Sequence, residues 1–209
     1  LAVKSGLLKA SLEPAESDVF IITVPTPFKN SKNNIPEPDI KYVVEVSYSI
    51  SKFIKKDNLI IIESTSPLGT TQMIQNIITK ESKLNHNDFK IAYCPERVIP
   101  GNAINEIINN DRVIGGINEI SSKAAKKLFG SFCKGKLHVT NAKTAELVKL
   151  TENAFRDTNI AFANELSIIS KKLDIDVHEL IRLANYHPRV NILTPSCGVG
   201  GHCIAIDPW

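Results

Sequence analysis

Short β-branched segments alternate with segments of helical periodicity through the first 140 or so of the 209 residues. The expected strands are residues 18–24, 58–62, 89–93, 112–117 and 137–140. The expected helices are residues 40–54, with Asp39 as N-cap, and then 70–81 and 121–132. Residues 29–38 are polar with prolines nearby and are expected to form a loop. Such alternation is typical of an α/β fold in which helices pack on a parallel sheet.

The pattern changes near residue 140, where we place a domain boundary. Residues 142–173 contain neither proline nor glycine and predict one helix of about 30 residues, near 45 Å long. A second helix is expected over residues 176–184, with Asp174 or Asp176 as its cap. A glycine-rich loop, residues 198–203, follows.

Charge and cysteine content exclude several classes of protein. The net charge of +3 comes from 25 Lys and Arg against 22 Asp and Glu, which is too balanced for a nucleic-acid-binding surface. No apolar run approaches the ~18 residues of a membrane span and no leader is recognisable, so we expect a cytoplasmic location and no membrane partner. Cys94, Cys133, Cys197 and Cys203 form no CxxC pair and are expected to be free thiols.

Three expected strands are followed by segments with unusual combinations of residues. Val24-Pro25-Thr26-Pro27 follows the first strand, residues 63–67 (Glu-Ser-Thr-Ser-Pro) follow the second, and residues 94–97 (Cys-Pro-Glu-Arg) follow the third. Open parallel sheets bind ligands at the carboxyl ends of their strands, so these segments predict a site. The alternative for each segment alone is that Pro and Ser or Thr end a strand and cap a helix.

The second half offers a separate set of reactive groups. Lys149 and Asn153 are four residues apart and share one face of the long expected helix. Cys203 stands in the glycine-rich loop, where a thiolate could act as a nucleophile, although a buried apolar cysteine is the alternative. A zinc site of Cys197, His202 and Cys203 has unusual spacing and lacks a fourth ligand, so no metal is expected.

No GxGxxG fingerprint occurs in the 209 residues. Either the sheet binds no dinucleotide, or the glycine-rich unit precedes Leu1. The chain also starts without Met and stops just after the glycine-rich segment, so we expect a fragment.

Five segments, in order, are similar to motifs of the UDP-glucose/GDP-mannose dehydrogenase family. They are residues 21–27 (IITVPTP), 63–71 (ESTSPLGTT), 94–97 (CPER), 145–153 (AELVKLTEN) and 200–203 (GGHC). Residues 93–101, 110–116 and 187–192 resemble the branch that acts on UDP-N-acetyl-D-mannosamine. Pro100 stands where the glucose branch has a second acid, and Ser196-Cys197 replaces the usual Gly-Pro, so Cys197 is given no role.

The resemblance implies an architecture and an activity. Residues 1–140 would be the later part of a Rossmann-type NAD-binding domain without its GxGxxG unit, and residues 141–209 a small all-α domain that carries the catalytic cysteine loop and forms a homodimer through the 142–173 helix. The implied reaction is the NAD-dependent, four-electron oxidation of the C6 alcohol of UDP-N-acetyl-D-mannosamine to the uronate, for surface polysaccharide biosynthesis. The 209 residues alone are expected to be inactive.

The resemblance also implies roles for individual residues. Cys203 would be the nucleophile, Lys149 and Asn153 would stabilise an oxyanion, and Asp207, Thr65 and Glu96 would position or activate water. NAD would be bordered by Val24, Pro25, Thr26, Ser64 and Thr65, and the UDP-sugar by Glu96, Arg97, Lys149, Asn153, Arg189 and Gly200.

Three alternatives remain at this stage. One is a 6-dehydrogenase for UDP-N-acetylglucosamine or UDP-glucose. Another is a two-electron hydroxyacid dehydrogenase, because a long helix with a Lys-x-x-x-Asn pair also occurs in that superfamily. The last is a non-enzymatic interaction module built on the long helix.

Overall fold

The computed structural model describes residues 3–30, 35–99, 101–200, 203–204 and 206–208, which divide into two compact units. The first unit comprises residues 1–26 and 39–146, and the second comprises residues 27–38 and 147–209. The division falls inside one long helix, between Glu146 and Leu147.

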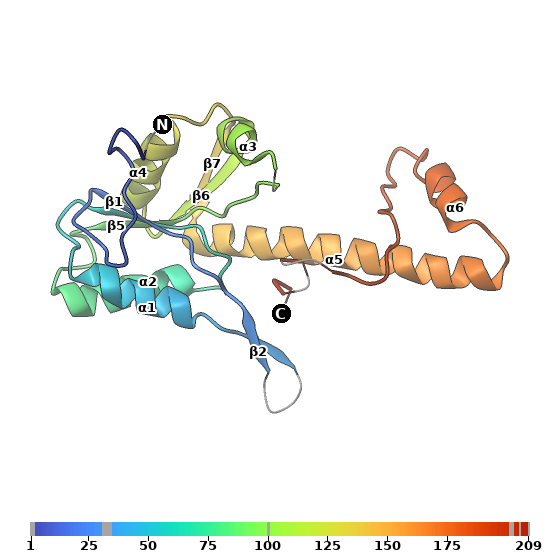
Figure 1. The fold of residues 1–209 in the computed structure, drawn as a ribbon, viewed down its shortest axis with the longest axis horizontal. Coiled ribbons are helices and arrows are strands. Elements are labelled where there is room, and N and C mark those ends of the chain that lie inside the picture. Colours follow the sequence, from blue (N-terminus) through green and yellow to red (C-terminus); the bar gives the residue numbers. More distant parts are fainter. Residues whose placement is uncertain (1–2, 31–34, 100, 201–202, 205, 209) are drawn as a thin grey trace. The chain divides into compact units, whose positions relative to one another are not determined.

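A five-stranded sheet forms the centre of the first unit (Figure 1). Its order is β1 (Val19–Ile22), β4 (Leu59–Ile62), β5 (Lys90–Tyr93), β6 (Arg112–Gly116) and β7 (Leu137–Asn141). The first three strands are parallel, with Ile22, Ile62 and Tyr93 in register at their carboxyl ends. All five strands expected from the sequence are therefore present.

The sheet is parallel as expected except at one pair, β5 and β6. Strand β6 runs antiparallel to β5, with Tyr93 opposite Gly115, and β7 then runs parallel to β6. A parallel connection needs a crossover, usually a helix packed on the sheet. The segment between β5 and β6 holds only the short helix α3 (Ala103–Asn109), which buries none of its residues, so the chain turns back at the edge where β5 ends. The sequence pattern did not predict α3.

Helices cover both faces of this sheet. Figure 1 shows α1 (Lys41–Ser51) and α2 (Thr70–Ser82) on one side and α4 (Glu119–Phe129) on the other. Alternate residues of β4 explain this: Ile60 and Ile62 pack with the α1 and α2 side, whereas Leu59 and Ile61 pack with the α4 side. A strand buried on both faces reads as a continuous apolar run, as β4 does.

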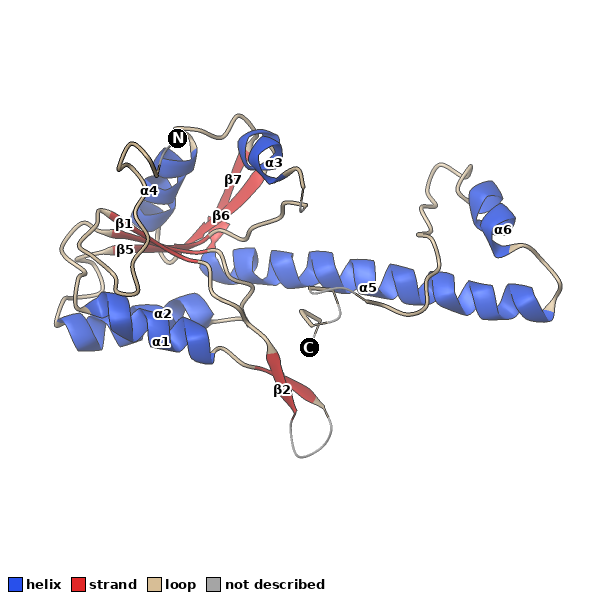
Figure 2. Cartoon of the chain, viewed as in Figure 1, coloured by secondary structure: helices blue, strands red, loops and turns tan. Residues whose placement is uncertain are grey.

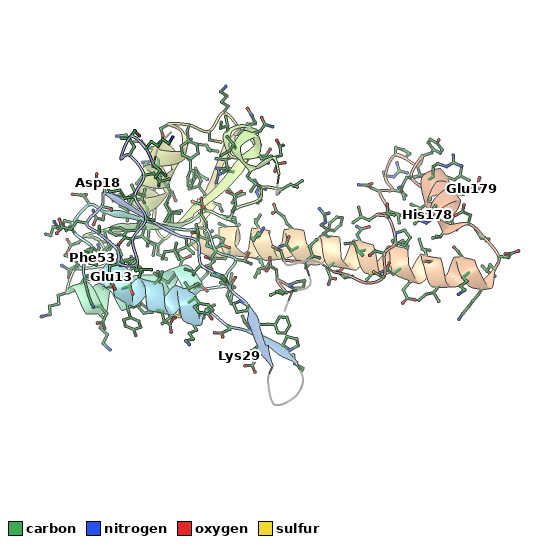
Figure 3. All side chains as sticks on the ribbon, viewed as in Figure 1. Glu13, Asp18, Lys29, Phe53, His178 and Glu179 are labelled. Atoms are coloured by element: carbon green, nitrogen blue, oxygen red, sulfur yellow. The ribbon has the colours of Figure 1, made fainter. Side chains whose placement is uncertain are left out.

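The second unit is mainly helical. Helix α5 (Ala142–Lys172) begins in the first unit and confirms the long helix expected from the absence of proline and glycine. Helix α6 (Val177–Ala184) is capped by Asp176, whose Oδ1 accepts the backbone N–H of His178 at 2.8 Å. His178 and Glu179 mark its first turn in Figure 3. In the described parts of the chain, no helix combines the length and apolar content that a membrane crossing requires.

A small hairpin replaces the loop expected over residues 29–38. Strands β2 (Phe28–Asn30) and β3 (Pro36–Pro38) pair antiparallel (Figure 2), with Lys29 opposite Glu37. Strands of three residues are too short to show an alternating pattern, and prolines occur in strands mainly at edges. The sequence signal for a loop was therefore misleading.

Candidate active site

The three strand ends singled out in the sequence meet at one edge of the sheet. Ser64 Oγ donates a hydrogen bond to the Val24 carbonyl at 2.7 Å, which ties the segment after β4 to the segment after β1. The backbone N–H of Cys94 donates to the Ile62 carbonyl at 2.9 Å, which extends the β4–β5 pairing to the third segment. Val24, Pro25, Thr26, Ser64 and Thr65 thus border the carboxyl edge, where open α/β sheets hold ligands.

A buried arginine lies between two carboxylates at the same edge. Arg112 is 6% exposed, and its Nη2 is 3.3 Å from Glu96 Oε2, while its Nη1 is 3.6 Å from Glu63 Oε1. The antiparallel course of β6 brings it there, because the first residue of a parallel β6 would lie at the opposite edge. Burial and the charge of Glu96 raise the pKa of Glu63, against the opposing charge of Arg112.

Two side-chain interactions join the segment after β5 to the start of β6. Besides the Arg112–Glu96 pair, the guanidinium of Arg97 donates to the carbonyl of Asp111. Glu96 Oε1 also accepts the backbone N–H of Arg97 at 2.5 Å. A small, partly open pocket results, lined by Pro95, Glu96, Arg97, Glu106, Asn110, Asp111 and Arg112.

A fully buried glutamate caps α2. Glu146, on the first turns of α5, accepts hydrogen bonds from Gly69 N at 2.6 Å and from Thr71 N and Oγ1 at 2.8 and 2.6 Å. A carboxylate is stabilised at the positive N-terminal end of a helix. Because Glu146 takes these amides, the N-terminus of α2 is not available to a ligand phosphate.

The second unit contains other site residues that the sequence predicts. Cys203 is exposed, and its carbonyl accepts the N–H groups of Ile206 at 3.0 Å and Asp207 at 2.8 Å, which forms a turn. Asn153 Nδ2 donates to Asp207 Oδ2 at 2.5 Å, so this turn is fastened to α5. Lys149 is half-buried and lies one helical turn before Asn153, on the same face of α5.

The remaining predicted residues of this unit are less constrained. Asn185 closes the 185–192 loop by bonding Ile192 N at 2.8 Å and Ile192 O at 2.9 Å, and this loop presents Arg189 to solvent. Gly200 is exposed, whereas Gly201, His202 and Pro100 of the sequence motifs lie outside the described residues. Within the described residues, no three His, Cys, Asp or Glu side chains form a group that could hold a metal ion.

Sequence reasoning gave no role to Glu63, Arg112 or Glu146. The available signal for Glu63 was its place directly after a buried strand, and all three residues fall inside motifs quoted above. Glu63 and Arg112 form an ion pair, and Glu146 caps a helix. Both kinds of contact depend on the tertiary structure, which the sequence pattern does not reveal.

Two family models together match most of the chain. The NAD binding domain of the UDP-glucose/GDP-mannose dehydrogenase family matches residues 2–133, and the central domain of the same family matches residues 143–209. The chain belongs to the UDP-glucose/GDP-mannose dehydrogenase family.

Relatives of known name lie close to this member of the family. It is 54% identical to the UDP-N-acetyl-D-mannosamine dehydrogenase of Campylobacter jejuni and 47% identical to the NDP-N-acetyl-D-galactosaminuronic acid dehydrogenase of Ralstonia nicotianae; both alignments cover 100% of the chain, and 53% and 50% of those proteins. The native structure of the UDP-N-acetyl-mannosamine dehydrogenase Cap5O from Staphylococcus aureus superposes with a TM-score of 0.88 at 44% identity, covering 99% of this chain and 50% of that one. The chain therefore spans about half the length of these relatives.

Proposed function

We propose that this chain is the part of an NAD-dependent nucleotide-sugar 6-dehydrogenase that holds most of its reacting groups. The proposed reaction is the four-electron oxidation of the C6 alcohol of UDP-N-acetyl-D-mannosamine to the uronate, in the cytoplasm, for surface polysaccharide biosynthesis. The observation that carries this proposal is the Cys203–Asp207 turn fastened to Asn153 on α5, in a member of this family.

The residues present fit one border of NAD but not its phosphates. Val24, Pro25, Thr26, Ser64 and Thr65 line the carboxyl edge and would hold the cofactor there. The chain contains no GxGxxG, and Glu146 already occupies the N-terminus of α2. When bound, NAD⁺ would supply the oxidising power, accepting one hydride in each of two oxidation stages.

Cys203 would retain the substrate carbon between the two stages. Its thiolate adds to the C6 aldehyde to form a thiohemiacetal, and after the second oxidation the same C–S bond belongs to a thioester. Water then attacks the thioester carbonyl, the C–S bond breaks, and the products are the carboxylate and the free thiol. The exposure of Cys203 supports this role, because an attacking thiol must be accessible.

Lys149 and Asn153 would stabilise the oxygen of the adduct. A fixed ammonium and an amide N–H on one helix face supply charge and a hydrogen bond where an oxyanion develops. Asp207 orients Asn153 through their hydrogen bond, and Asp207, Thr65 and Glu96 would position or activate the hydrolytic water. Glu96, Arg97, Lys149, Asn153, Arg189 and Gly200 would contact the UDP-sugar.

The substrate assignment has both support and an alternative. Relatives named for N-acetyl-D-mannosamine support that sugar, whereas the Ralstonia relative supports a wider class of N-acetylhexosamines. UDP-N-acetylglucosamine and UDP-glucose are the remaining candidates.

The test is the stoichiometry of NADH formation by the full-length protein that contains this chain. Limiting UDP-N-acetyl-D-mannosamine should yield two NADH per sugar and a uronate product identified by mass spectrometry. One NADH per substrate would support a two-electron dehydrogenase instead. No NADH with any UDP-sugar would overturn the enzymatic proposal and leave an interaction module on α5.

A homodimer through the 142–173 helix completes the proposal. The described residues of α5 carry exposed apolar side chains seven residues apart, Phe155 (69% exposed), Phe162 (51%) and Ile169 (49%). Apolar residues at a heptad interval form a seam that a second helix can cover. Ala163, on the same helix, is buried within the chain itself. We propose no nucleic-acid or membrane partner.

A further inference from the structure

Arg112 is held more firmly than an ordinary surface arginine. Its backbone N–H donates to Lys136 O at 2.9 Å in the β6–β7 pairing. Its guanidinium carbon lies 4.7 Å from the centroid of the Phe129 ring, a cation–π distance. Burying a charge in this way is costly unless the charge is paired, and Glu63 and Glu96 are the ion-pair partners of Arg112.

We propose that Arg112 is a positioning residue that holds the Glu96 carboxylate in place at the carboxyl edge. This inference rests on the proposed function, in which Glu96 handles the hydrolytic water. Glu96 Oε2 faces Arg112 and Glu96 Oε1 accepts the N–H of Arg97, so both oxygens have a defined direction. The Glu96 side chain is 32% exposed, so water can reach it.

The fork of an arginine suits this role better than a lysine. The two Nη atoms face different carboxylates, Glu63 directly after β4 and Glu96 in the segment after β5, while the guanidinium carbon lies over the Phe129 ring. A lysine ammonium is a point charge that would keep the charge but not the two-sided geometry. Arg112 therefore pairs with the more buried carboxylate, Glu63, on one side and with the more exposed carboxylate, Glu96, on the other.

The neighbouring Asp111 and Glu106 carboxylates have hydrogen-bond partners of their own. The Asp111 carboxylate is bonded to His138 Nε2 and to Lys136 N, each at 2.8 Å. Glu106 bonds the backbone N–H of Ile99 at 2.8 Å. Burial and the charge of Glu63 raise the pKa of the Cys94 thiol, so Cys94 adds no charge near neutral pH.

The first measurement is steady-state NADH formation by the full-length protein. Arg112→Gln should lower kcat by about tenfold or more, part of the 10²–10⁴-fold that a positioned acid–base group supplies, with little change in KM for the UDP-sugar. Arg112→Lys should recover part of the loss. Combining Arg112→Gln with Glu96→Gln should be no slower than Glu96→Gln alone, because both changes act through one carboxylate.

The matched control is Arg182→Gln, which breaks an exposed pair with Glu179 on α6 and should leave kcat unchanged. If Arg112 is purely structural, Arg112→Gln should lower the midpoint of thermal unfolding without changing kcat. Additive losses of kcat in the double variant would also indicate that Arg112 does not act through Glu96. Either result overturns the proposal.

A second measurement separates this proposal from the proposed function. In carbon-13 NMR titrations, Arg112→Gln should raise the pKa of Glu63, and Glu96→Gln should lower it, because the two neighbours act on Glu63 in opposite senses. If the protein forms no NADH with any UDP-sugar but these shifts occur, the proposed function fails while the Arg112 cluster stands. If neither shift occurs, the Arg112 proposal fails whatever the activity.

Discussion

At the scale of single residues, the proposed chemistry depends on the exposed thiol of Cys203 in the second unit. Cys203→Ala should remove covalent capture and lower turnover by more than ~10³-fold, or ~4 kcal/mol, while binding of the UDP-sugar is nearly unchanged. Cys203→Ser should form the adduct slowly and make its hydrolysis the slow step. NADH formation with UDP-N-acetyl-D-mannosamine measures both. Cys197→Ala, at another exposed thiol, is the control, and a Cys203→Ala enzyme with more than about a tenth of normal turnover would contradict the thioester mechanism.

Lys149 and Cys203 should behave as one unit. Lys149→Ala removes the cation that would stabilise the adduct oxygen, so its loss of turnover should be comparable to that of Cys203→Ala. The double variant should be little worse than either single variant, because in the proposed mechanism both side chains act on one intermediate. Losses that multiply in the double variant would show that the two act in separate steps.

Glu63 gives a pH dependence of stability with a definite sign. Burial raises its pKa in the folded state above the ordinary value of 4.5, so the folded state binds the proton more tightly. Stability contributed by this group is therefore present at low pH and is lost as pH rises through the raised pKa. Urea unfolding of wild type and Glu63→Gln between pH 4 and 8 should show the variant gaining relative to wild type as pH rises. A constant difference across that range would contradict the assignment.

At the scale of secondary-structure elements, the start of α5 and the N-terminus of α2 depend on each other through Glu146. Glu146→Gln replaces a carboxylate with an amide that cannot accept all three hydrogen bonds, so the first unit should lose about 2 kcal/mol of stability, as for other buried polar groups left unpaired. Thermal unfolding should then shift down by roughly 4–8 °C. Glu165→Gln, on the exposed face of the same helix, should change the midpoint little. An equal effect of both variants would contradict the cap.

The elements also show what the linear pattern can and cannot reveal. Hydrophobic periodicity located the five strands and the long helices, because burial depends on local spacing. Strand direction is not a local property, so the reversal at β6 was missed and, with it, the arrival of Arg112 beside Glu63 and Glu96. The candidate residues of the second unit can be proposed from their sequence motifs, whereas the hydrogen bond from Asn153 to Asp207 joins positions 54 residues apart and is visible only in the fold.

At the scale of the whole molecule, the 209 residues should bind NAD weakly or not at all. The chain lacks the glycine-rich phosphate cradle, and the helix N-terminus that could have held a phosphate is filled by Glu146. Isothermal calorimetry on residues 1–209 should therefore show no micromolar binding. A micromolar dissociation constant would mean that the carboxyl edge alone supplies a complete cofactor site.

The exposed apolar residues of α5 lead to a prediction about how the whole protein assembles. Three apolar side chains repeat at seven-residue intervals on α5 and would form a continuous seam exposed to water. The full-length protein should therefore be a dimer at micromolar concentrations, as measured by light scattering. A paired change, Phe155→Asp with Phe162→Asp, places two charges in that seam and should yield monomers that keep their helical content by circular dichroism. Ile120→Asp alters an equally exposed apolar residue on α4 and should leave the dimer intact, because no heptad partner accompanies it. A monomeric parent protein, or a dimer that survives both seam charges, would show that α5 is covered in some other way.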